Sequence, residues 1–349
     1  MEHTISISAS RERKVRDTSN MPFGVQPTEH MFMAVYRENT WEDARIIPFS
    51  NLQMSPLALC LHYGQTVFEG MKAFLMEDGG INIFRPDKHY ERFNKSLERM
   101  CMPSVPKELF VGALRSLVQL DAGWVPEGEH GSLYLRPFMI ATEERIGVKI
   151  SDEYLFMVVA TPAFQYYTQP LKIRVETEYT RAADGGTGAA KCGGNYGAAF
   201  YPSKLAREAG YDQVIWTDSK QHEYIEESGT MNLMFFIGDT LVTPPLSGTI
   251  LDGVTRDSLL TLAKGAGMKV EVRPVRYREL QDALEHGVRL EAFGAGTAAV
   301  IAPVATIAIE GKEYSCYTGA DARMYQLRDM LLRIRKGSDP DVHKWNYII

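Results

Sequence analysis

The chain has 349 residues, of which 45% are hydrophobic, so its length and composition support two domains with cores of their own. The net charge of −6 argues against a nucleic-acid-binding protein, and no apolar run reaches the ~20 residues of a membrane helix. Four scattered cysteines without a CxxC pair indicate neither a metal site nor a disulfide framework. Residues 1–22 lack the apolar core of a signal peptide, and we expect them to form a flexible N-terminal arm of a cytoplasmic protein.

The first half of the chain alternates short strands with helices. Strand-forming residues dominate residues 30–36, and residues 69–84 are typical of a β-hairpin. Apolar residues recur at helical spacing within 85–103, which predicts an amphipathic helix. The other predicted elements here are a helix over 107–120 and strands over 132–143 and 154–161. Together they predict a smaller α+β domain of antiparallel character over residues 23–168.

The second half begins after a polar, weakly periodic stretch, residues 169–184, which we interpret as an interdomain loop. We expect residues 185–349 to form a larger domain. A tight turn from Gly294 to Thr297 is predicted to separate two strand segments. The other predicted elements are helices over 198–210, 253–267 and 321–337, strands over 212–218 and 268–275, and a hairpin over 232–245.

Lys191 lies in the middle of a stretch, residues 185–200, in which ten of the sixteen residues are glycine or alanine. The preceding residues superficially resemble a phosphate-binding loop, but Cys192 stands where Ser or Thr should follow the lysine. A lysine in a tight, partly dry site also suits a Schiff base, because burial lowers the amine pKa. Pyridoxal phosphate (PLP) needs such a lysine, an acid for its ring nitrogen and a cradle for its phosphate.

Candidates for the acid and the cradle follow along the chain. Glu226 and Glu227 precede a hydrophobic strand, and since neighbours on a strand alternate faces, only one of them should point inward. The amides of Val254 and Thr255 open a predicted helix, where unpaired N–H groups suit an anion, although ordinary capping by Thr255 would also explain the pattern. Arg92 on the amphipathic helix could add a positive charge.

Taken in order, these motifs resemble those of the branched-chain-amino-acid aminotransferases, which are PLP enzymes of fold type IV. The resemblance covers roughly residues 23–335 and is carried by stretches such as "LHYGQTVFEGMKAF", "KCGGNYG", "EESGTMNL" and "FGAGTAAVIAPV". It implies an α+β fold of two domains, with mixed sheets and a barrel-like larger domain.

The resemblance also implies roles for single residues. Lys191 looks like the Schiff-base lysine, Tyr196 like the tyrosine on the cofactor's phenolic oxygen, and Glu227 like the carboxylate on the pyridine nitrogen. Arg92, Val254, Thr255 and Thr297 look like the phosphate-binding groups. The resemblance assigns to the substrate pocket Phe68, Tyr63, Tyr134, Arg136, Ile146, Thr297 and Ala298. Tyr134 and Ile146 would come from a neighbouring subunit, which implies a homodimer.

The implied reaction is transfer of an amino group between leucine, isoleucine or valine and 2-oxoglutarate, in a ping-pong cycle through Lys191. Glutamate and the 2-oxo acids would be the other small-molecule partners, with no nucleic acid or membrane involved. D-amino-acid transaminase and aminodeoxychorismate lyase share the fold and remain alternatives. Two hypotheses from other functional classes also remain: a PLP carrier without catalytic activity, and a nucleotide-binding module. In the mammalian branched-chain aminotransferases, a pair of cysteines follows the turn that corresponds to Gly294–Thr297. In this sequence Ala299 and Ala302 stand at those two positions.

Overall fold

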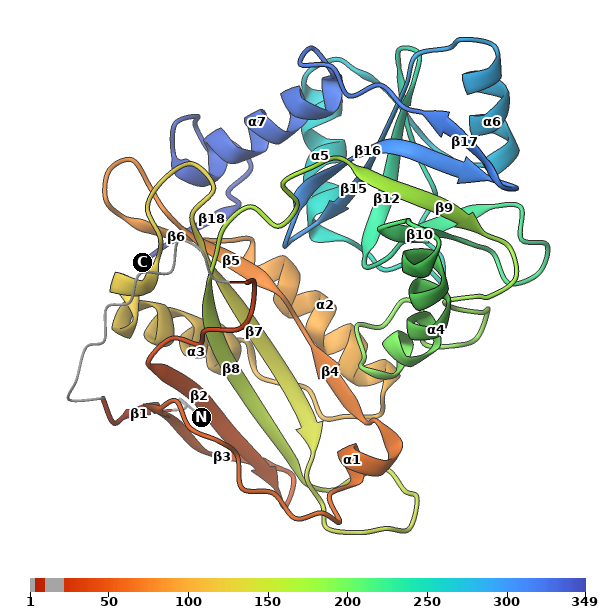
Figure 1. Ribbon diagram of the computed structural model, residues 1–349. Coiled ribbons are helices and arrows are strands. Elements are labelled where there is room, and N and C mark those ends of the chain that lie inside the picture. The colour runs from red at the N-terminus through yellow and green to blue at the C-terminus, as the bar shows by residue number, and fades with distance from the viewer. Residues whose placement is uncertain (1–3, 10–21) are drawn as a thin grey trace. The chain divides into compact units, whose positions relative to one another are not determined.

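The computed structural model describes residues 4–9 and 22–349, which form two compact units (Figure 1). Unit 1 comprises Met1–Tyr166, Ala190–Gly194 and Ile334–Ile349, and unit 2 comprises Tyr167–Ala189 and Asn195–Arg333. The chain therefore leaves unit 1 and returns to it twice. Within the described ranges, no helix is both long and apolar enough to cross a membrane.

Unit 1 is built on a mixed nine-stranded sheet, in which only β1 and β3 pair in parallel. The strand order is β1-β3-β2-β8-β7-β5-β6-β18, with β4 also paired to β7. The strands are β1 (Ser6–Ile7), β2 (His30–Arg37), β3 (Thr40–Pro48), β4 (Thr66–Phe68), β5 (Met71–Leu75), β6 (Ile81–Phe84), β7 (Ser132–Ala141), β8 (Tyr154–Ala163) and β18 (Asn346–Ile348). The helices are α1 (Leu59–Tyr63), α2 (Pro86–Arg99) and α3 (Lys107–Leu120), followed by the short 3₁₀ turn Ala122–Trp124.

Helices α2 and α3 pack on one face of this sheet and close the core of unit 1 (Figure 1). The rings of Phe93 and Phe110, from α2 and α3, lie 5.7 Å and 5.9 Å from that of Phe156 on β8. All three side chains are fully buried. The helical spacing of apolar residues in 85–103 thus marks the face of α2 that packs on the sheet, and the predicted amphipathic helix is confirmed.

Unit 2 contains a second nine-stranded sheet of mixed direction. Its strands are β9 (Leu171–Glu176), β10 (Gln213–Thr217), β11 (Ile225–Ser228), β12 (Met231–Ile237), β13 (Thr240–Thr243), β14 (Lys269–Val272), β15 (Leu290–Gly296), β16 (Val300–Ile309) and β17 (Lys312–Ser315). Their order is β11-β10-β9-β16-β15-β12-β13-β14, and β11 also pairs with β12. That extra pairing closes a ring of strands, which gives the larger unit its barrel-like sheet. The helices are α4 (Gly194–Glu208), α5 (Val254–Gly265), α6 (Tyr277–Glu285) and α7 (Arg323–Lys336).

Three details differ from the sequence-based expectations. Strand β9 lies where an interdomain loop was predicted over 169–184, and it pairs with β10 and β16. Residues 334–349 belong to unit 1 rather than to the larger domain. The turn between β15 and β16 comprises residues 297–299 instead of beginning at Gly294, which is paired with Leu233 and Ala302.

Gly294 serves close packing rather than a turn. A Cβ atom placed there would lie 2.7 Å from the side chain of Met231, which is nearer than real atoms approach. The glycine therefore lets the sheet accommodate a neighbouring methionine, and the chain reverses three residues later.

Candidate functional site

The strands β4 and β5 present two chemically different faces. Along residues 67–72, Val67, Glu69 and Met71 are fully buried on the face covered by α2 and α3. Phe68 and Lys72 point to the opposite face by strand alternation, as do their cross-strand partners Phe138 and Tyr134 on β7. This second face of the sheet carries three of the seven pocket residues named from the sequence: Phe68, Tyr134 and Arg136.

Lys191 is held beside β4 by main-chain hydrogen bonds. The amide of Phe68 donates to the carbonyl of Lys191 at 3.0 Å, and the amide of Gly193 donates to the carbonyl of Thr66 at 3.2 Å. The amide of Lys191 donates to Ser96 Oγ of α2 at 2.9 Å. A Cβ atom on Gly193 would lie 2.4 Å from Thr66 Oγ1, so this backbone approach requires a glycine. The glycines around Lys191 therefore let the segment lie against β4 as a short extra strand.

The side chain of Lys191 lies within a row of cations and aromatic rings. Its Nζ is 4.8 Å from the centre of the Phe68 ring, and the Arg136 guanidinium lies at the same distance from that ring. Arg136 Nη2 donates a hydrogen bond to the Tyr134 hydroxyl at 3.1 Å. The structure therefore brings together four of the predicted residues: Lys191, Phe68, Arg136 and Tyr134.

Tyr134 is fitted closely to its own chain. It is only 7% exposed, and a Cβ atom on Gly70 would lie 1.9 Å from its hydroxyl oxygen. The Phe23 ring packs against it edge-on at 4.9 Å. Tyr134 is thus held beside the Arg136 of its own chain.

Arg92 is held by an acid that the sequence analysis did not single out. Its Nε and Nη2 donate to the two carboxylate oxygens of Glu69 at 2.7 Å and 2.8 Å. Glu69 also contacts His89 Nδ1 at 2.7 Å and is fully buried. Burial alone would raise the pKa of Glu69, but Arg92 and His89 hold that pKa well below its usual range. Burial lowers the pKa of His89 more than Glu69 raises it. The bidentate pair fixes the guanidinium plane of Arg92.

Tyr63 and Ile146 form a separate, exposed group. The Tyr63 hydroxyl donates to the carbonyl of Ile146, which joins α1 to the loop after β7. Their side chains are 44% and 62% exposed, and the neighbouring Val148 is 77% exposed. Tyr63, Ile146 and Val148 thus form a small apolar group at the surface.

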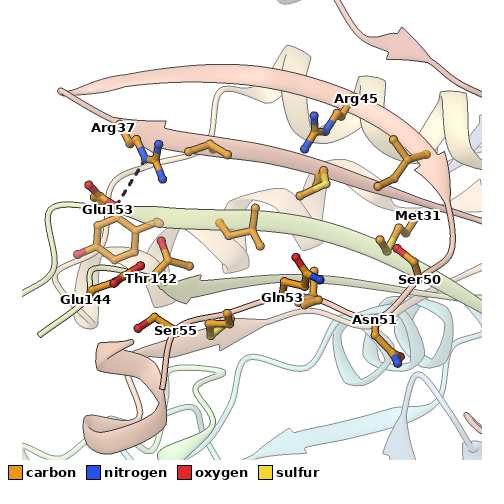
Figure 2. Close-up of a pocket in the computed structure, with 17 residues that line it drawn as sticks. Met31, Arg37, Arg45, Ser50, Asn51, Gln53, Ser55, Thr142, Glu144 and Glu153 are labelled. Carbon is orange, nitrogen blue, oxygen red and sulfur yellow. Dashed lines mark ion pairs between the residues drawn. The ribbon is translucent and has the colours of Figure 1, made fainter. Parts of the chain in front are cut away.

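A groove of about 540 Å³ lies further along the sheet, on the face that carries Arg136 (Figure 2). The shared face follows from the pairing of Arg136 with Val159 and of Val159 with Met31. Apolar side chains of β2, β3 and β8 form its floor, residues 50–55 border it, and an Arg37–Glu153 ion pair of 3.5 Å lies at its rim. None of the predicted site residues lines this groove.

In unit 2, both candidate acids are buried. Glu226 is 7% exposed and Glu227 is 4% exposed, so the expectation that only one would point inward is wrong. Glu227 Oε1 accepts a hydrogen bond of 2.6 Å from the amide of Leu251, and its Oε2 lies 3.4 Å from Arg181 Nε. Arg181 was missed because it lies in the segment interpreted as a polar loop. A single arginine among polar residues carries no signal of a buried partner.

The N-terminus of α5 suits an anion. Its N-cap is Gly253, and no side chain caps it, so the alternative of ordinary capping by Thr255 is wrong. Val254 and Thr255 are 2% and 3% exposed. A Cβ atom on Gly253 would lie 1.8 Å from Asn232 Oδ1, so only glycine fits there. A helix start of this kind offers main-chain N–H groups and the positive end of the helix dipole.

Three further predicted residues lie elsewhere in unit 2. Tyr196 lies in the first turn of α4 and is partly exposed. Thr297 and Ala298 occupy the turn between β15 and β16, and both are partly exposed.

Comparisons with known proteins show the family of the chain. The family model described as amino-transferase class IV matches residues 66–307. The chain is 41% identical over 350 residues to "Branched-chain-amino-acid aminotransferase 2" of Bacillus subtilis (strain 168), which covers 99% of this chain and 96% of that protein. It is 45% identical over 301 residues to "Branched-chain-amino-acid transaminase 1" of the same organism, covering 85% of each.

Solved structures are also similar. A branched-chain amino acid aminotransferase from the organism abbreviated T.th., complexed with N-(5'-phosphopyridoxyl)-L-glutamate, aligns with a TM-score of 0.73 at 26% identity, over 90% of this chain and 97% of that one. The PLP form of the Thermobaculum terrenum enzyme aligns with a TM-score of 0.76 at 22% identity, over 92% and 98%, which shows the fold. The predicted α+β fold of type IV is therefore confirmed, and the chain belongs to the family of class IV aminotransferases.

Proposed function

We propose that this protein transfers the amino group between branched-chain L-amino acids and 2-oxoglutarate, using pyridoxal phosphate. The observation that carries the proposal is the row of Lys191, Phe68, Arg136 and Tyr134, in which a lysine amine faces an aromatic wall and a second cation. The relatives named as branched-chain-amino-acid aminotransferases supply the substrate class. They favour this reading over a D-amino-acid transaminase or a lyase of the same fold.

The donor set fits the cofactor's phosphate. We assign the amides of Val254 and Thr255, at the N-terminus of α5, to this anion, because the N-cap there is Gly253 and makes no side-chain cap hydrogen bond. We assign Arg92, held in one orientation by Glu69, to the same phosphate, together with Thr297. An oriented guanidinium is a strong partner for phosphate oxygens.

The remaining cofactor contacts concern its ring. We assign Glu227, a buried carboxylate oriented by Arg181 and the Leu251 amide, to the protonated pyridine nitrogen. Tyr196 is assigned to the phenolic oxygen. When bound, pyridoxal phosphate supplies an electron sink for the charge that develops at the substrate Cα.

Lys191 is proposed to bind the cofactor covalently and, once released by the incoming amino acid, to move the Cα proton as a general base. Thr297 and Ala298 are assigned to the substrate α-carboxylate. Phe68 provides an apolar wall for a branched side chain, and Arg136 provides a cation for the second carboxylate of glutamate. One pocket can thus accept both donors of a ping-pong cycle.

Tyr134 is assigned to the pocket of its own chain, because its hydroxyl accepts a hydrogen bond from the Arg136 of that chain. Ile146 and Tyr63, in contrast, are exposed together, and we propose that they complete the pocket of a second copy in a homodimer. The apolar floor of the groove on the same sheet face supports a further contact between copies. A cytoplasmic location stays a prediction.

An amino-donor panel with 2-oxoglutarate tests the function. We expect leucine, isoleucine and valine to give glutamate in their L forms, and D-leucine to give none. Turnover of D-amino acids alone, or release of pyruvate without transfer, would refute the proposal. Light scattering of the Ile146→Asp variant tests the dimer, which the introduced charge should weaken.

A further inference from the structure

Glu226 and Glu227 occupy a β-bulge. Ile215 of β10 pairs with Ser228, but Thr217 pairs with Ile225, so two steps along β10 match three steps along β11. One residue of β11 is therefore extra, and the two glutamates share a single position opposite Trp216. Bulges re-aim side chains, which explains why two adjacent carboxylates are both buried instead of alternating between a wet and a dry face.

Both carboxylates reach the same short segment. Glu226 Oε1 accepts a hydrogen bond from Thr249 Oγ1, and Glu227 Oε1 accepts one from the amide of Leu251. Two negative groups thus approach each other within one region of unit 2, and like charges in a buried site disfavour simultaneous ionisation.

Positive charge in this region comes from Arg181. Its Nε lies 3.4 Å from Glu227 Oε2, and its Nη2 donates to the carbonyls of Thr249 and Gly188. The other charged groups that act on Glu226 are Glu227 of its own strand and Asp218, from the turn after β10, and both repel its ionised form. Arg256 of α5 also attracts Glu227. Two cations, Arg181 and Arg256, thus act on three carboxylates, those of Glu226, Glu227 and Asp218, which leaves one negative charge in excess.

The second oxygen of Glu226 gives independent geometric evidence. Glu226 Oε2 is buried and has no hydrogen-bond partner among the residues that the structure describes. A buried ionised oxygen without a donor is costly, whereas a protonated carboxyl leaves no charge there. Burial, the first of the causes, raises the pKa of Glu226 to about 7, in spite of the Thr249 hydrogen bond and Arg181.

We propose that Glu226 carries a proton in the cofactor-free protein and releases it to solvent when a second cation, the protonated pyridine ring, binds at Glu227. This inference rests on the proposed function of Glu227. Before binding, Glu226 is neutral and Glu227 is the ionised partner of Arg181. Binding adds one cation to the region. The O–H bond of Glu226 breaks, its proton passes to the buffer, and the net charge of the region is therefore the same in both states. Glu226 is then a positioning residue that acts through the charge of Glu227.

The first experiment measures how many protons are released when a cofactor analogue binds, and how the affinity depends on pH. The probe is pyridoxine 5'-phosphate, which has no aldehyde and so adds no covalent step at Lys191. Calorimetry in two buffers of different ionisation enthalpy counts the protons released. The phosphate of the probe has a second pKa of about 6 and releases protons of its own, so each count is compared with that of Glu226→Gln. We expect the wild type to release about one proton more per site at pH 6, below the point where Glu226 ionises, and no more at about pH 8.5. The ratio of the two affinities should change about tenfold for each pH unit up to neutrality and then level off.

The Glu226→Gln variant keeps an acceptor for Thr249 but has no proton to release. At acidic pH the variant should release about one proton fewer on binding than the wild type. Its affinity for the probe should lack the part of the pH dependence that comes from ionisation of Glu226. Glu223→Gln is the matched control, since Glu223 lies just before β11 with its side chain 41% exposed. Equal proton counts in the wild type and Glu226→Gln would overturn the proposal.

The cofactor-free protein reports on Glu226 alone. Because the folded pKa lies above the unfolded one, the wild type should lose stability relative to Glu226→Gln as pH rises from about 4.5 to about 7. Parallel stability profiles would refute the buried proton. If that profile is as expected but Glu227→Gln leaves binding of the probe unchanged, the assignment of Glu227, and with it the proton release, is wrong.

Discussion

Replacement of Glu69 by Gln tests the ion pair that orients Arg92. The carboxylate is fully buried and takes part in four contacts, with Arg92 Nε and Nη2, His89 Nδ1 and the amide of Gly70, at 2.7 Å to 3.1 Å. Gln offers one acceptor oxygen, and its amide N–H groups would face the N–H groups of Arg92. Removal of one partner from a buried pair costs about 3–5 kcal/mol, because the other charge is left uncompensated.

Urea unfolding at pH 7.5 measures this loss of free energy. Glu91→Gln is the matched control, since Glu91 is a glutamate of α2 with its side chain 57% exposed, 3.6 Å from Lys88. Such a surface pair contributes about 0–1 kcal/mol. The depressed pKa of Glu69 means that its stabilisation is present above the unfolded value of 4.5 and is lost as the pH falls below it.

The two urea curves, wild type and Glu69→Gln, should therefore converge in acid. A loss below about 1 kcal/mol at pH 7.5, or a difference that does not change with pH, would refute the reasoning about this pair.

Three further predictions concern the reaction. Lys191→Ala should fold but lose nearly all turnover and the borohydride-reducible link to the cofactor, and substantial turnover would exclude Lys191 as the catalytic lysine. Glu227→Gln should bind the cofactor modestly more weakly but still retain it, and should lower kcat about ten- to hundred-fold, from a charge-assisted contact of about 1.5–3 kcal/mol; stopped-flow rates that match those of Glu223→Gln would contradict this. Gly70→Ala should displace Tyr134, whose hydroxyl lies 1.9 Å from the added Cβ position, and raise KM more than it lowers kcat; unchanged kinetics would show that Tyr134 does not line the pocket.

Local patterns predicted much of the fold. The amphipathic helix expected within 85–103 is α2, Pro86–Arg99, because its periodicity depends only on neighbours along the chain. Strand β9 was missed although Leu171 and Ile173 alternate with polar residues and are buried. Its partners, β10 and β16, lie far along the sequence, and the short polar surroundings concealed the alternation.

In the candidate site, too, features that depend on neighbours along the chain were predictable, and features that depend on distant strand pairing were not. The predicted roles of Lys191 and Glu227 come from motif order, since both lie in short, recognisable stretches. The burial of Glu226 was not predictable, because the bulge depends on how β11 pairs with β10, and alternation along a single strand cannot reveal an extra residue. The role of Glu69 in holding Arg92 depends likewise on the packing of α2 against β4.

The return of residues 334–349 to unit 1 has a consequence for protein synthesis. β18 pairs with β6, so β6 has an unpaired edge until residues 346–348 have left the ribosome. All of unit 2 is translated in between, which takes roughly 10–40 s at typical rates of elongation. An unpaired strand edge is a template for pairing with other chains. Nascent chains should therefore need protection from aggregation until the last strand of unit 1 is added, long after its first 166 residues have been made.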